Sequence, residues 1–543
     1  MSESFSLIDD PWIPARFRDG HATDLSIREV FSEAQGIREL GGELPTQTFA
    51  ITRLLLAILY RVADNNVTDE LWEAWWRDGL PLGEIDAYLD RHAERFDLLH
   101  PERPFFQVAD LATAKGEMKE VTPLILDLPS NNRLFTNRSG SGAARLSYAE
   151  AARWLVNAQA FDASGIKSGD PRDPRVKGGK GYPIGIAWSG HLGGLVCEGE
   201  TLHETLLLNL VGGGKYVEQS PSDLPPWEEE EPDGAAERAQ LHPSGPVRLF
   251  TWQSRRVRLL PRDGAIVGCL LTNGDALTPQ NMQNHETMTA WRYSEPQTKK
   301  LGRPTYMPRE HRPERAFWRG IGALIPASAN ASSTKGVAPS LVPATILWAS
   351  ALQSDGILDP RRRVRVRAIG VVYGSQSSVV DDVIDDRLTL SLAVLSEQHP
   401  ALGAEAENAV HLADEGVWAL RRLAENLSRA AGGDGEGDRV RAEESAYAAL
   451  DGPYREWLAG LDQDTDPGTA ISDWKATARS ILRGLGADLV RAASPSAWRG
   501  RELPGRGGTE LINTSRAESW FLHALHNTFG APKLAGIEKE TTV

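Results

Sequence analysis

Residues 361–373, RRRVRVRAIGVVY, alternate charged and apolar side chains. Arg363, Arg365 and Arg367 occupy every second position, and a valine or an alanine follows each of them. A period of two is that of a β-strand, so the pattern predicts a strand with one cationic face. The glycine- and serine-rich stretch that follows, with Gln376 at its centre, predicts a polar tip at the end of that strand.

Four carboxylates follow the tip in the segment DDVIDD, namely Asp381, Asp382, Asp385 and Asp386. Such a group could hold Mg²⁺, which prefers oxygen ligands. A simpler interpretation is that acidic residues are favoured in the first turn of a helix, near the positive end of its dipole. We therefore expect a helix to begin here.

The hydrophobic period changes near residue 380. Before it, short β-like runs such as PVRLFTWQ (246–253), RVRLLP (256–261) and IVGCLLT (266–272) alternate with a few helices and Gly/Pro-rich loops. After it, apolar residues recur at helical spacing, and breakers at 430–438, 462–468 and 501–508 separate about four segments. The sequence thus predicts an α+β fold, with a mixed domain over residues 1–380 followed by a four-helix bundle over residues 381–543.

Length and composition fit a globular protein of at least two domains, because 543 residues exceed the size of one core. Two cysteines, Cys197 and Cys269, cannot build a disulfide framework, and we expect a reducing, cytoplasmic location. The most apolar early stretch, residues 51–62, is too short to cross a bilayer and contains Arg53 and Arg61. It predicts a buried helix and no membrane partner.

The net charge of −15 argues at first against a nucleic-acid partner, but the distribution of charge along the chain matters more than the sum. Residues 381–543 hold 27 acidic and 17 basic residues, so the last third of the chain carries −10 of the total. Residues 292–319 hold eight Lys or Arg against three Glu. A local cationic surface on an acidic protein is therefore expected.

Catalytic and metal-binding patterns are weak in this sequence. The stretch VKGGKGY is not a phosphate-binding loop, because Pro174 stands where the first glycine should be and Gly181 follows Lys180 in place of Ser or Thr. His523 and His526 lie three apart on a helical segment, yet no acidic or cysteine partner accompanies them. We expect no catalytic residue, no metal and no cofactor.

Three glycine-rich loops remain: residues 133–147, residues 161–182 and the tip around Gln376. The second holds five glycines and five Lys or Arg against three Asp. Glycine lets the backbone approach a ligand closely, and Lys or Arg neutralises phosphate, so these loops suit a nucleic acid. Ordinary surface loops would have the same composition, and that alternative stays open.

Several short stretches, taken in order, resemble the CasA family, the large subunits of the type I-E CRISPR surveillance complex Cascade. They are SLIDDPWIPARF (6–17), HPERPFFQV (100–108), VTPLILDL (121–128), LFTN (134–137), TLLLNLV (205–211), LFTWQ (249–253) and YGSQSS (373–378). The helical remainder agrees with the four-helix bundle of that family. The resemblance implies a non-catalytic subunit that recognises the protospacer-adjacent motif (PAM) of double-stranded DNA and helps to open the duplex.

The resemblance also implies roles for individual residues. Gln376 would insert beneath the PAM as a wedge, and a side chain driven into a base step costs a few kcal/mol that nearby phosphate contacts offset. Ser375 and Ser377 flank it and would touch the groove. The family's glycine loop along the minor groove matches Ala163, Ser164 and Gly165, although only one glycine remains here. Tentative contacts to the DNA backbone are Lys167, Arg363, Arg365 and Arg367.

The family loop that meets the 5′ handle of the guide RNA and the adjoining subunits matches residues 134–142. Phe135 would stack or anchor there, and Asn137 and Arg138 would make polar contacts, although Phe135 could equally be a core residue. A PAM-contacting lysine of the family has no clear counterpart in this sequence. The implied partners are the guide RNA, double-stranded target DNA, the other Cascade subunits and a recruited helicase-nuclease.

Two alternatives compete with this interpretation. The first is a soluble enzyme with a helical accessory domain, but no nucleophile, base and orienting residue can be assembled from nearby motifs. The second is a transcription regulator, but the acidic bundle lacks a helix-turn-helix with basic recognition residues.

Overall fold

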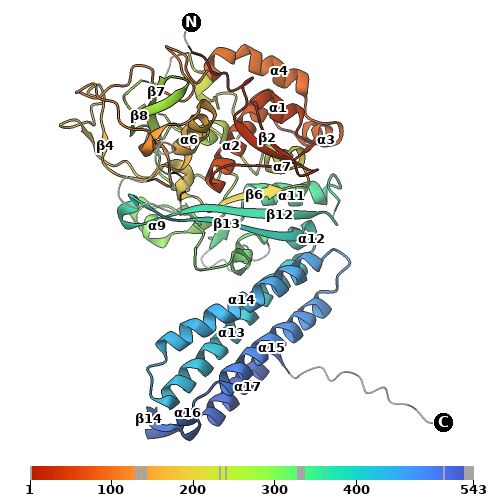
Figure 1. Ribbon diagram of the computed structural model, residues 1–543. Coiled ribbons are helices and arrows are strands. Elements are labelled where there is room, and N and C mark those ends of the chain that lie inside the picture. The colour runs from red at the N-terminus through yellow and green to blue at the C-terminus, as the bar shows by residue number, and fades with distance from the viewer. Residues whose placement is uncertain are drawn as a thin grey trace. The chain divides into compact units, whose positions relative to one another are not determined.

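The computed structural model describes residues 3–530 apart from 129–135, 137, 139–143, 231–233, 239–240, 327–336, 360 and 506–507 (Figure 1). The chain forms two compact units. The first comprises Met1–Phe317, Ala329–Asp359 and Val364–Leu388, and the second comprises Trp318–Ser328, Pro360–Arg363 and Thr389–Val543.

The first unit mixes helices and small sheets. Its helices are α1 (Ile27–Ser32), α2 (Pro45–Val62), α3 (Asp69–Asp78), α4 (Leu82–Arg91), α6 (Tyr148–Phe161), α7 (Leu202–Asn209), α8 (Pro246–Phe250), α9 (Glu295–Leu301) and α11 (Ala344–Ser354). Short 3₁₀ turns lie at Ala93–Phe96, Thr122–Leu124, Trp188–His191, Pro226–Glu228 and Ser375–Ser377, and a longer 3₁₀ segment, Phe317–Ala323, leads into the second unit. α1 begins at Ser26, whose hydroxyl accepts from the N–H of Glu29 while the Glu29 carboxylate accepts from the N–H of Ser26, a capping box.

Helix α2 contains the apolar stretch 51–62, and most of its residues are buried in the core of the first unit. The predicted buried helix is therefore confirmed. Arg53 is buried within it, and its guanidinium donates two hydrogen bonds of 2.7 and 2.8 Å to the carboxylate of Glu286. The same carboxylate accepts from the indole of Trp188 at 2.7 Å. This buried pair is satisfied on both sides, which is the condition for tolerating charge in a core.

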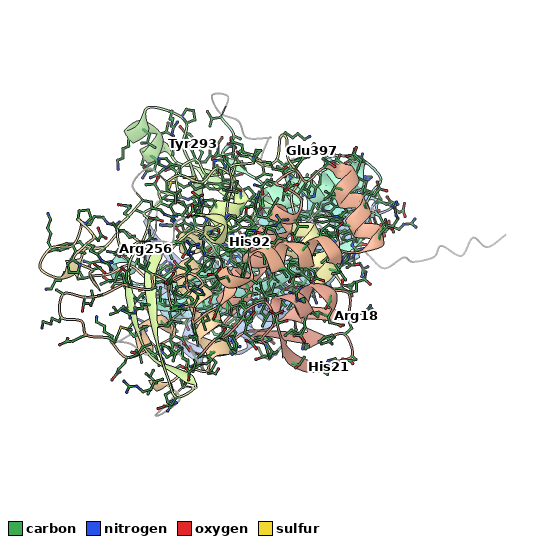
Figure 2. The ribbon with its side chains drawn as sticks, turned by 90° about the horizontal axis from the view of Figure 1, so that it is seen from above. Arg18, His21, His92, Arg256, Tyr293 and Glu397 are labelled. Carbon is green, nitrogen blue, oxygen red and sulfur yellow. The ribbon has the colours of Figure 1, made fainter. Side chains whose placement is uncertain are left out.

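The strands of the first unit form several separate small sheets. β1 (Ile13–Phe17), β2 (Ala22–Leu25) and β3 (Ile37–Leu40) form one; β4 (Lys167–Ser168) pairs with β5 (Lys180–Gly181); β7 (Arg255–Arg262) pairs with β8 (Ala265–Asn273); β9 (Trp291–Tyr293), β10 (Tyr306–Pro308) and β11 (Ser340–Leu341) form another. In Figure 2, Arg256 of β7 and Tyr293 of β9 mark two of these sheets in the view from above.

The longest strands are β12 (Arg363–Tyr373) and β13 (Val380–Ser391), which lie beside β6 (Gly194–Glu198) in the order β13-β12-β6 (Figure 1). β6 and β12 are antiparallel, with Arg365 opposite Glu198 and Arg367 opposite Val196. This sheet confirms the strand predicted from the alternating arginines and carries the Gln376 tip between its two long strands.

The second unit is a helical bundle, as predicted, and the α+β fold class is confirmed. Its helices are α12 (Leu392–Leu395), α13 (Pro400–Ala431), α14 (Glu436–Gly460), α15 (Pro467–Arg491), α16 (Pro495–Arg499) and α17 (Thr514–Phe529). The predicted breakers at 430–438 and 462–468 separate α13 from α14 and α14 from α15. The third, at 501–508, coincides with the first part of a hairpin of β14 (Arg501–Gly505) and β15 (Gly508–Ile512).

The bundle core includes Trp318, which comes from an upstream segment of the chain that belongs to the second unit. Trp318 is fully buried, its ring stacks on Tyr454 at 4.4 Å, and its indole N–H donates to Asp451 at 2.9 Å. Tyr454 also packs edge-on against Trp474. Trp318 therefore belongs to the hydrophobic core of the second unit.

Two local predictions are wrong. The acidic segment 381–386 does not begin a helix but lies in β13, where pairing with β12 overrides the weak helix preference of its carboxylates. The β-like run PVRLFTWQ begins as helix α8, whose first residue is Pro246, a position that proline favours. The predicted domain boundary at 380 coincides with the first residue of β13, whereas the two compact units divide after Leu388.

Candidate nucleic-acid interface

Gln376 lies at the outer end of the β12–β13 hairpin. It is exposed, and its φ of 55° places it in the left-handed region, as does the φ of 54° at Ser377. The turn closes through hydrogen bonds from Gly374 N–H to Val379 O at 3.0 Å and from Ser377 N–H to Gly374 O at 2.9 Å. A glutamine held at positive φ costs about 1 kcal/mol, a cost that the surrounding hydrogen bonds must offset.

The base of the tip is anchored to the first core. The hydroxyl of Tyr373, the last residue of β12, donates to the carbonyl oxygen of Phe161 at 2.6 Å, at the end of α6. Burial raises the pKa of this hydroxyl far above its ordinary value, so Tyr373 remains a donor. Gly190 makes the approach possible, because a Cβ there would lie 2.4 Å from the Tyr373 oxygen. The exposed tip thus stands on a fixed base.

The tip is bonded directly to the second predicted loop. The backbone N–H of Ser164 donates to the carbonyl oxygen of Ser377 at 2.8 Å. Ala163, Ser164 and Gly165 are half-buried, and Gly165 has a φ of 146°, which favours glycine. The structure therefore brings together the two segments that the family resemblance implies as PAM contacts, although they lie more than two hundred residues apart in the chain.

Arg255 holds the Ala163–Gly165 loop from beneath, and the sequence analysis missed it. Its side chain is 1% exposed, and its guanidinium donates to the carbonyl oxygens of Ala163 at 3.1 Å and Gly185 at 2.9 Å. It also donates to the carboxylate of Asp162. The available signal was an arginine between Ser254 and Arg256 at the start of an expected strand, which gives no indication of its partners.

Lys167 has a structural partner in the same place. Its ammonium lies 2.5 Å from the carboxylate of Asp162, and only 13% of its side chain is exposed. Burial lowers the pKa of Lys167, against the opposing effect of Asp162. Burial alone would raise the pKa of Asp162, but the charges of Lys167 and Arg255 outweigh it and lower that pKa. The charge of Lys167 is thus neutralised by Asp162 within the fold, and its tentative contact with a DNA phosphate stays a prediction.

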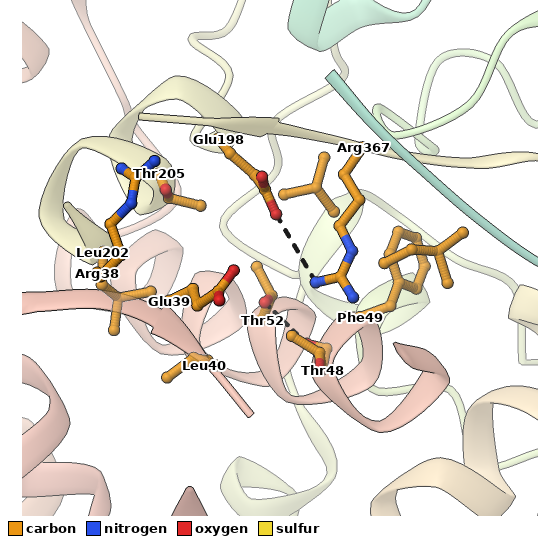
Figure 3. A pocket seen from close by; sticks show the side chains of 12 residues that line it. Arg38, Glu39, Leu40, Thr48, Phe49, Thr52, Glu198, Leu202, Thr205 and Arg367 are labelled. Carbon is orange, nitrogen blue, oxygen red and sulfur yellow. Dashed lines mark hydrogen bonds and ion pairs between the residues drawn. The ribbon is translucent and has the colours of Figure 1, made fainter. Parts of the chain in front are cut away.

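The predicted cationic face of β12 is corrected. Glu198, which is 7% exposed, lies 3.2 Å from Arg365 and 3.7 Å from Arg367. Glu198 and Arg367 line a small pocket (Figure 3). Arg367 further donates two hydrogen bonds of 2.6 and 2.8 Å to Asp385. Arg387 contacts Glu198 at 3.1 Å.

Three arginines thus converge on the single carboxylate of Glu198, and they join β6, β12 and β13. Arg365 and Arg367 hold this sheet together instead of facing solvent as a row of positive charge. Arg363, at the first position of β12, is exposed.

The predicted guide-RNA loop is described at one of its three named positions. Phe135 and Asn137 lie outside the described residues. Arg138 is described, and its guanidinium bonds the carboxylates of Glu43 at 2.5 Å and Glu150 at 2.9 Å. Its charge is thus shared between two acids, and its side chain is 12% exposed.

The other candidate sites of the sequence have simple structural settings. Asp381 and Asp382 are exposed on β13, Asp385 pairs with Arg367, and Asp386 accepts from the N–H of Phe317 at 2.8 Å. His523 and His526 are exposed on α17. No group of three or more His, Cys, Asp or Glu placed to hold a metal ion occurs among the residues that the structure describes. Within the same residues, no helix has the length and apolarity that a bilayer crossing requires.

Comparison with known proteins assigns the fold and the family. The family model described as CRISPR-associated protein Cse1 matches residues 6–485, and the chain belongs to this Cse1 (CasA) family of CRISPR-associated proteins. The crystal structure of Thermobifida fusca Cse1 is similar, with 42% identity, a TM-score of 0.89, and coverage of 97% of this chain and 98% of that one.

Two further relatives extend the comparison. The CRISPR-associated protein CasA/Cse1 of Thermus thermophilus is 28% identical over 535 residues, which cover 94% of this chain and 99% of the relative. A chain of a structure described as a CRISPR RNA-guided surveillance complex shares the fold at 19% identity, with a TM-score of 0.68 and coverage of 96% and 99%. The resemblance seen in the sequence is confirmed at family level.

Proposed function

We propose that this chain is the non-catalytic large subunit of a type I-E CRISPR RNA-guided surveillance complex. In this role it recognises the PAM in double-stranded DNA and helps to open the duplex for pairing with the guide RNA. It also contacts the 5′ handle of that RNA and docks the helicase-nuclease that follows. Family membership and the fold shared with a chain of a surveillance complex support the assignment.

The observation that carries the proposal is the hydrogen bond between Ser164 and Ser377. It fixes the Ala163–Gly165 loop against the Gln376 tip, so that one loop can follow a minor groove while the tip enters the adjacent base step. Minor-groove edges distinguish mainly A·T from G·C, and a reader made of backbone and small side chains should accept several PAM sequences. Gln376 acts as the wedge, and Ser375 and Ser377 touch the groove beside it.

A wedge needs a rigid support, because the cost of unstacking a base pair must not be lost in bending the protein. The Tyr373 to Phe161 hydrogen bond and the Arg255 clamp supply that support on the two sides of the tip. The Glu198 network keeps β12 and β13 in register behind it. The cost of opening one step, a few kcal/mol, is of the size that adjacent backbone contacts offset.

The test compares the reconstituted complex containing wild-type chain with one containing Gln376→Ala. Binding is measured on a PAM-containing duplex and on the same DNA already unpaired beside the PAM. We expect loss on the duplex and recovery on the pre-opened DNA, because only the first requires the wedge. Gln35→Ala, which removes an exposed glutamine elsewhere in the first unit, is the matched control. Unchanged binding on both DNAs with Gln376→Ala would refute the wedge.

A further inference from the structure

The segment between Ile166 and Tyr182 is a folded hairpin, although its composition suggested an ordinary glycine-rich loop. β4 and β5 pair with Lys167 opposite Gly181 and Ser168 opposite Lys180. On the other edge of β5, Lys180 also forms a bridge with Lys177 through two backbone hydrogen bonds of 3.0 and 3.1 Å. Gly178 and Gly179 close the turn with φ of 59° and 75°, and two successive positive values are those of a tight type I′ turn.

The same segment contains two Asp-Pro-Arg repeats, and in each repeat the arginine pairs with the aspartate. Asp170 accepts from the backbone N–H and the guanidinium of Arg172, and Asp173 does the same with Arg175 two residues on. Both aspartates are buried, and hydrogen bonds from Arg172 lower the pKa of Asp170 to about 2. The arginines of the segment therefore serve its own structure.

Lys177 and Lys180 are different from the other cations of the segment. Both are exposed, and within the described residues neither forms an ion pair. They stand directly opposite each other, and like charges in that position are destabilising by about 0.2 to 1 kcal/mol. Two lysines held together by a rigid turn, with no carboxylate between them, concentrate positive charge at the end of the hairpin.

The same face of the hairpin exposes two apolar side chains. Ile166 is 62% exposed and Tyr182 is 55% exposed. Side chains alternate along a strand, so Lys180 and Tyr182 share one face, and the register places Ile166 across from Tyr182. Asn273 fixes the backbone here, since its amide donates to the Tyr182 carbonyl oxygen at 2.6 Å. The opposite face carries Lys167, which is turned inward to Asp162.

This hairpin continues directly from the Ala163–Gly165 loop, and one residue separates Ser164 from Ile166. The Ser164 to Ser377 hydrogen bond ties its base to the Gln376 tip. A surface of clustered lysines beside an exposed aromatic ring is a typical nucleic-acid contact, in which the cations take phosphates and the ring takes a sugar or a base. Charge complementarity and this continuity favour DNA over a protein partner.

We propose that the outer face of the β4–β5 hairpin, formed by Ile166, Lys177, Lys180 and Tyr182, binds the sugar-phosphate backbone of the target duplex beside the PAM. Lys177 and Lys180 each neutralise a phosphate, and Tyr182 with Ile166 packs on the adjoining sugars. The inference rests on the proposed function, because it takes the Gln376 tip to face the same DNA. It assigns phosphate contacts to two lysines that, unlike Lys167 and Arg367, form no ion pair within the described residues.

The experiment measures the affinity of the reconstituted complex for PAM-containing duplex over a range of NaCl concentrations. Each phosphate contact contributes about 0.9 to the slope of log K against log salt. We expect Lys177→Ala/Lys180→Ala to reduce that slope by between about 1 and 2, and Lys177→Arg/Lys180→Arg to keep it. Tyr182→Ala should weaken binding without changing the slope, because it removes an apolar contact.

Two controls separate this surface from the rest of the protein. Lys475→Ala/Arg499→Ala removes the same charge from the bundle and should leave the slope unchanged. Gln376→Ala should weaken duplex binding while keeping the slope. If the double alanine variant keeps both affinity and slope while Gln376→Ala still fails on the duplex, the hairpin proposal is wrong and the proposed function stands. If neither variant changes DNA binding, the proposed function fails as well.

One further outcome would also overturn the hairpin proposal. Loss of a subunit or of the guide RNA from the complex containing Lys177→Ala/Lys180→Ala, seen by size-exclusion chromatography, would show that the face binds a component of the complex instead of target DNA. Lys177→Arg/Lys180→Arg is the control for misfolding, because it changes the same two positions but keeps both positive charges.

Discussion

The backbone N–H of Ser164 donates a 2.8 Å hydrogen bond to the carbonyl oxygen of Ser377. Ser164 follows helix α6, and Ser377 lies in the turn between β12 and β13. Because both groups belong to the main chain, the contact does not depend on either side chain. It makes the relative position of the two loops a property of the fold.

Substitution at Ser164 can test this contact. Ser164→Pro removes the N–H, whereas Ser164→Ala keeps it and removes only the hydroxyl. We expect the proline variant to lose affinity for PAM-containing duplex in the reconstituted complex and the alanine variant to bind almost normally. Equal binding by both variants would mean that the backbone contact contributes nothing to recognition.

Gln376 should separate stability from function. Glycine adopts a φ of 55° without steric cost, so Gln376→Gly should relieve strain, partly offset by the greater freedom of glycine in the unfolded chain. We expect the free energy of unfolding in urea to be unchanged or higher by up to about 1 kcal/mol. Duplex binding should nevertheless be lost, as for Gln376→Ala, and a clear destabilisation by glycine would contradict the strained geometry.

Arg255 should be essential for the loop that it supports. Arg255→Met leaves the buried Asp162 with one cationic partner, and it leaves the carbonyl oxygens of Ala163 and Gly185 without their donor. We therefore expect a loss of about 3 to 5 kcal/mol in urea unfolding. Arg255→Lys keeps the positive charge but lacks the planar guanidinium with its several donors. This variant should therefore be more stable than Arg255→Met but less stable than wild type.

The matched control for Arg255 lies on the same strand. Arg258 is half-buried and donates to the carbonyl oxygen of Leu111 at 3.0 Å, so Arg258→Met should cost no more than about 1.5 kcal/mol. Similar losses of stability in Arg255→Met and Arg258→Met would show that Arg255 stabilises the fold no more than an ordinary half-buried arginine.

His191 should make stability depend on pH. Burial, and to a lesser degree the charge of Arg255, lowers the pKa of His191 to about 4, against about 6.5 in an unfolded chain. The unfolded state therefore takes up a proton first as the pH falls. The contribution is fully present above about pH 6.5 and is lost between about 6.5 and 4, to a total of up to about 3 kcal/mol.

Urea unfolding of wild-type chain and His191→Asn at several pH values between 7 and 4 checks this expectation. The wild-type stability should fall more steeply than that of the variant through this window. Parallel curves would assign the acid sensitivity to other groups.

The arginines of β12 should differ sharply from one another. Arg367→Leu removes the partner of the exposed Asp385 and one of three cationic partners of the buried Glu198, and should cost about 1 to 3 kcal/mol. The exposed Arg363→Ala should change stability by no more than about 0.5 kcal/mol. If Arg367→Leu instead left stability intact and reduced the salt dependence of DNA binding, β12 would present a cationic face to DNA after all.

Local pattern predicted the elements of this region but not their partners. The alternation in residues 363–373 was sufficient to predict β12, because a period of two follows from strand geometry alone. The same alternation predicts a cationic strand face, whereas Arg365 and Arg367 pair with Glu198, which comes from a strand far upstream in the chain. An ion pair between distant segments leaves no local signal.

Asp381 and its neighbours show the opposite problem. Their local preference was interpreted as a helix start, but the turn at Gln376 returns the chain alongside β12, whose backbone groups need partners. The hydrogen bonding of the sheet then decides the conformation. The Ser164 to Ser377 contact was equally invisible, because a backbone N–H and a backbone carbonyl are present at almost every position.

The placement of Trp318 in the bundle core has a practical consequence for dissecting this protein. A fragment that starts at Thr389 contains every helix of the bundle named above but lacks the ring that stacks on Tyr454. Such a fragment would expose an aromatic cavity and would be prone to aggregate. A chimera that takes its bundle from a relative would therefore need two separate segments of that relative, the one around Trp318 and the helices themselves.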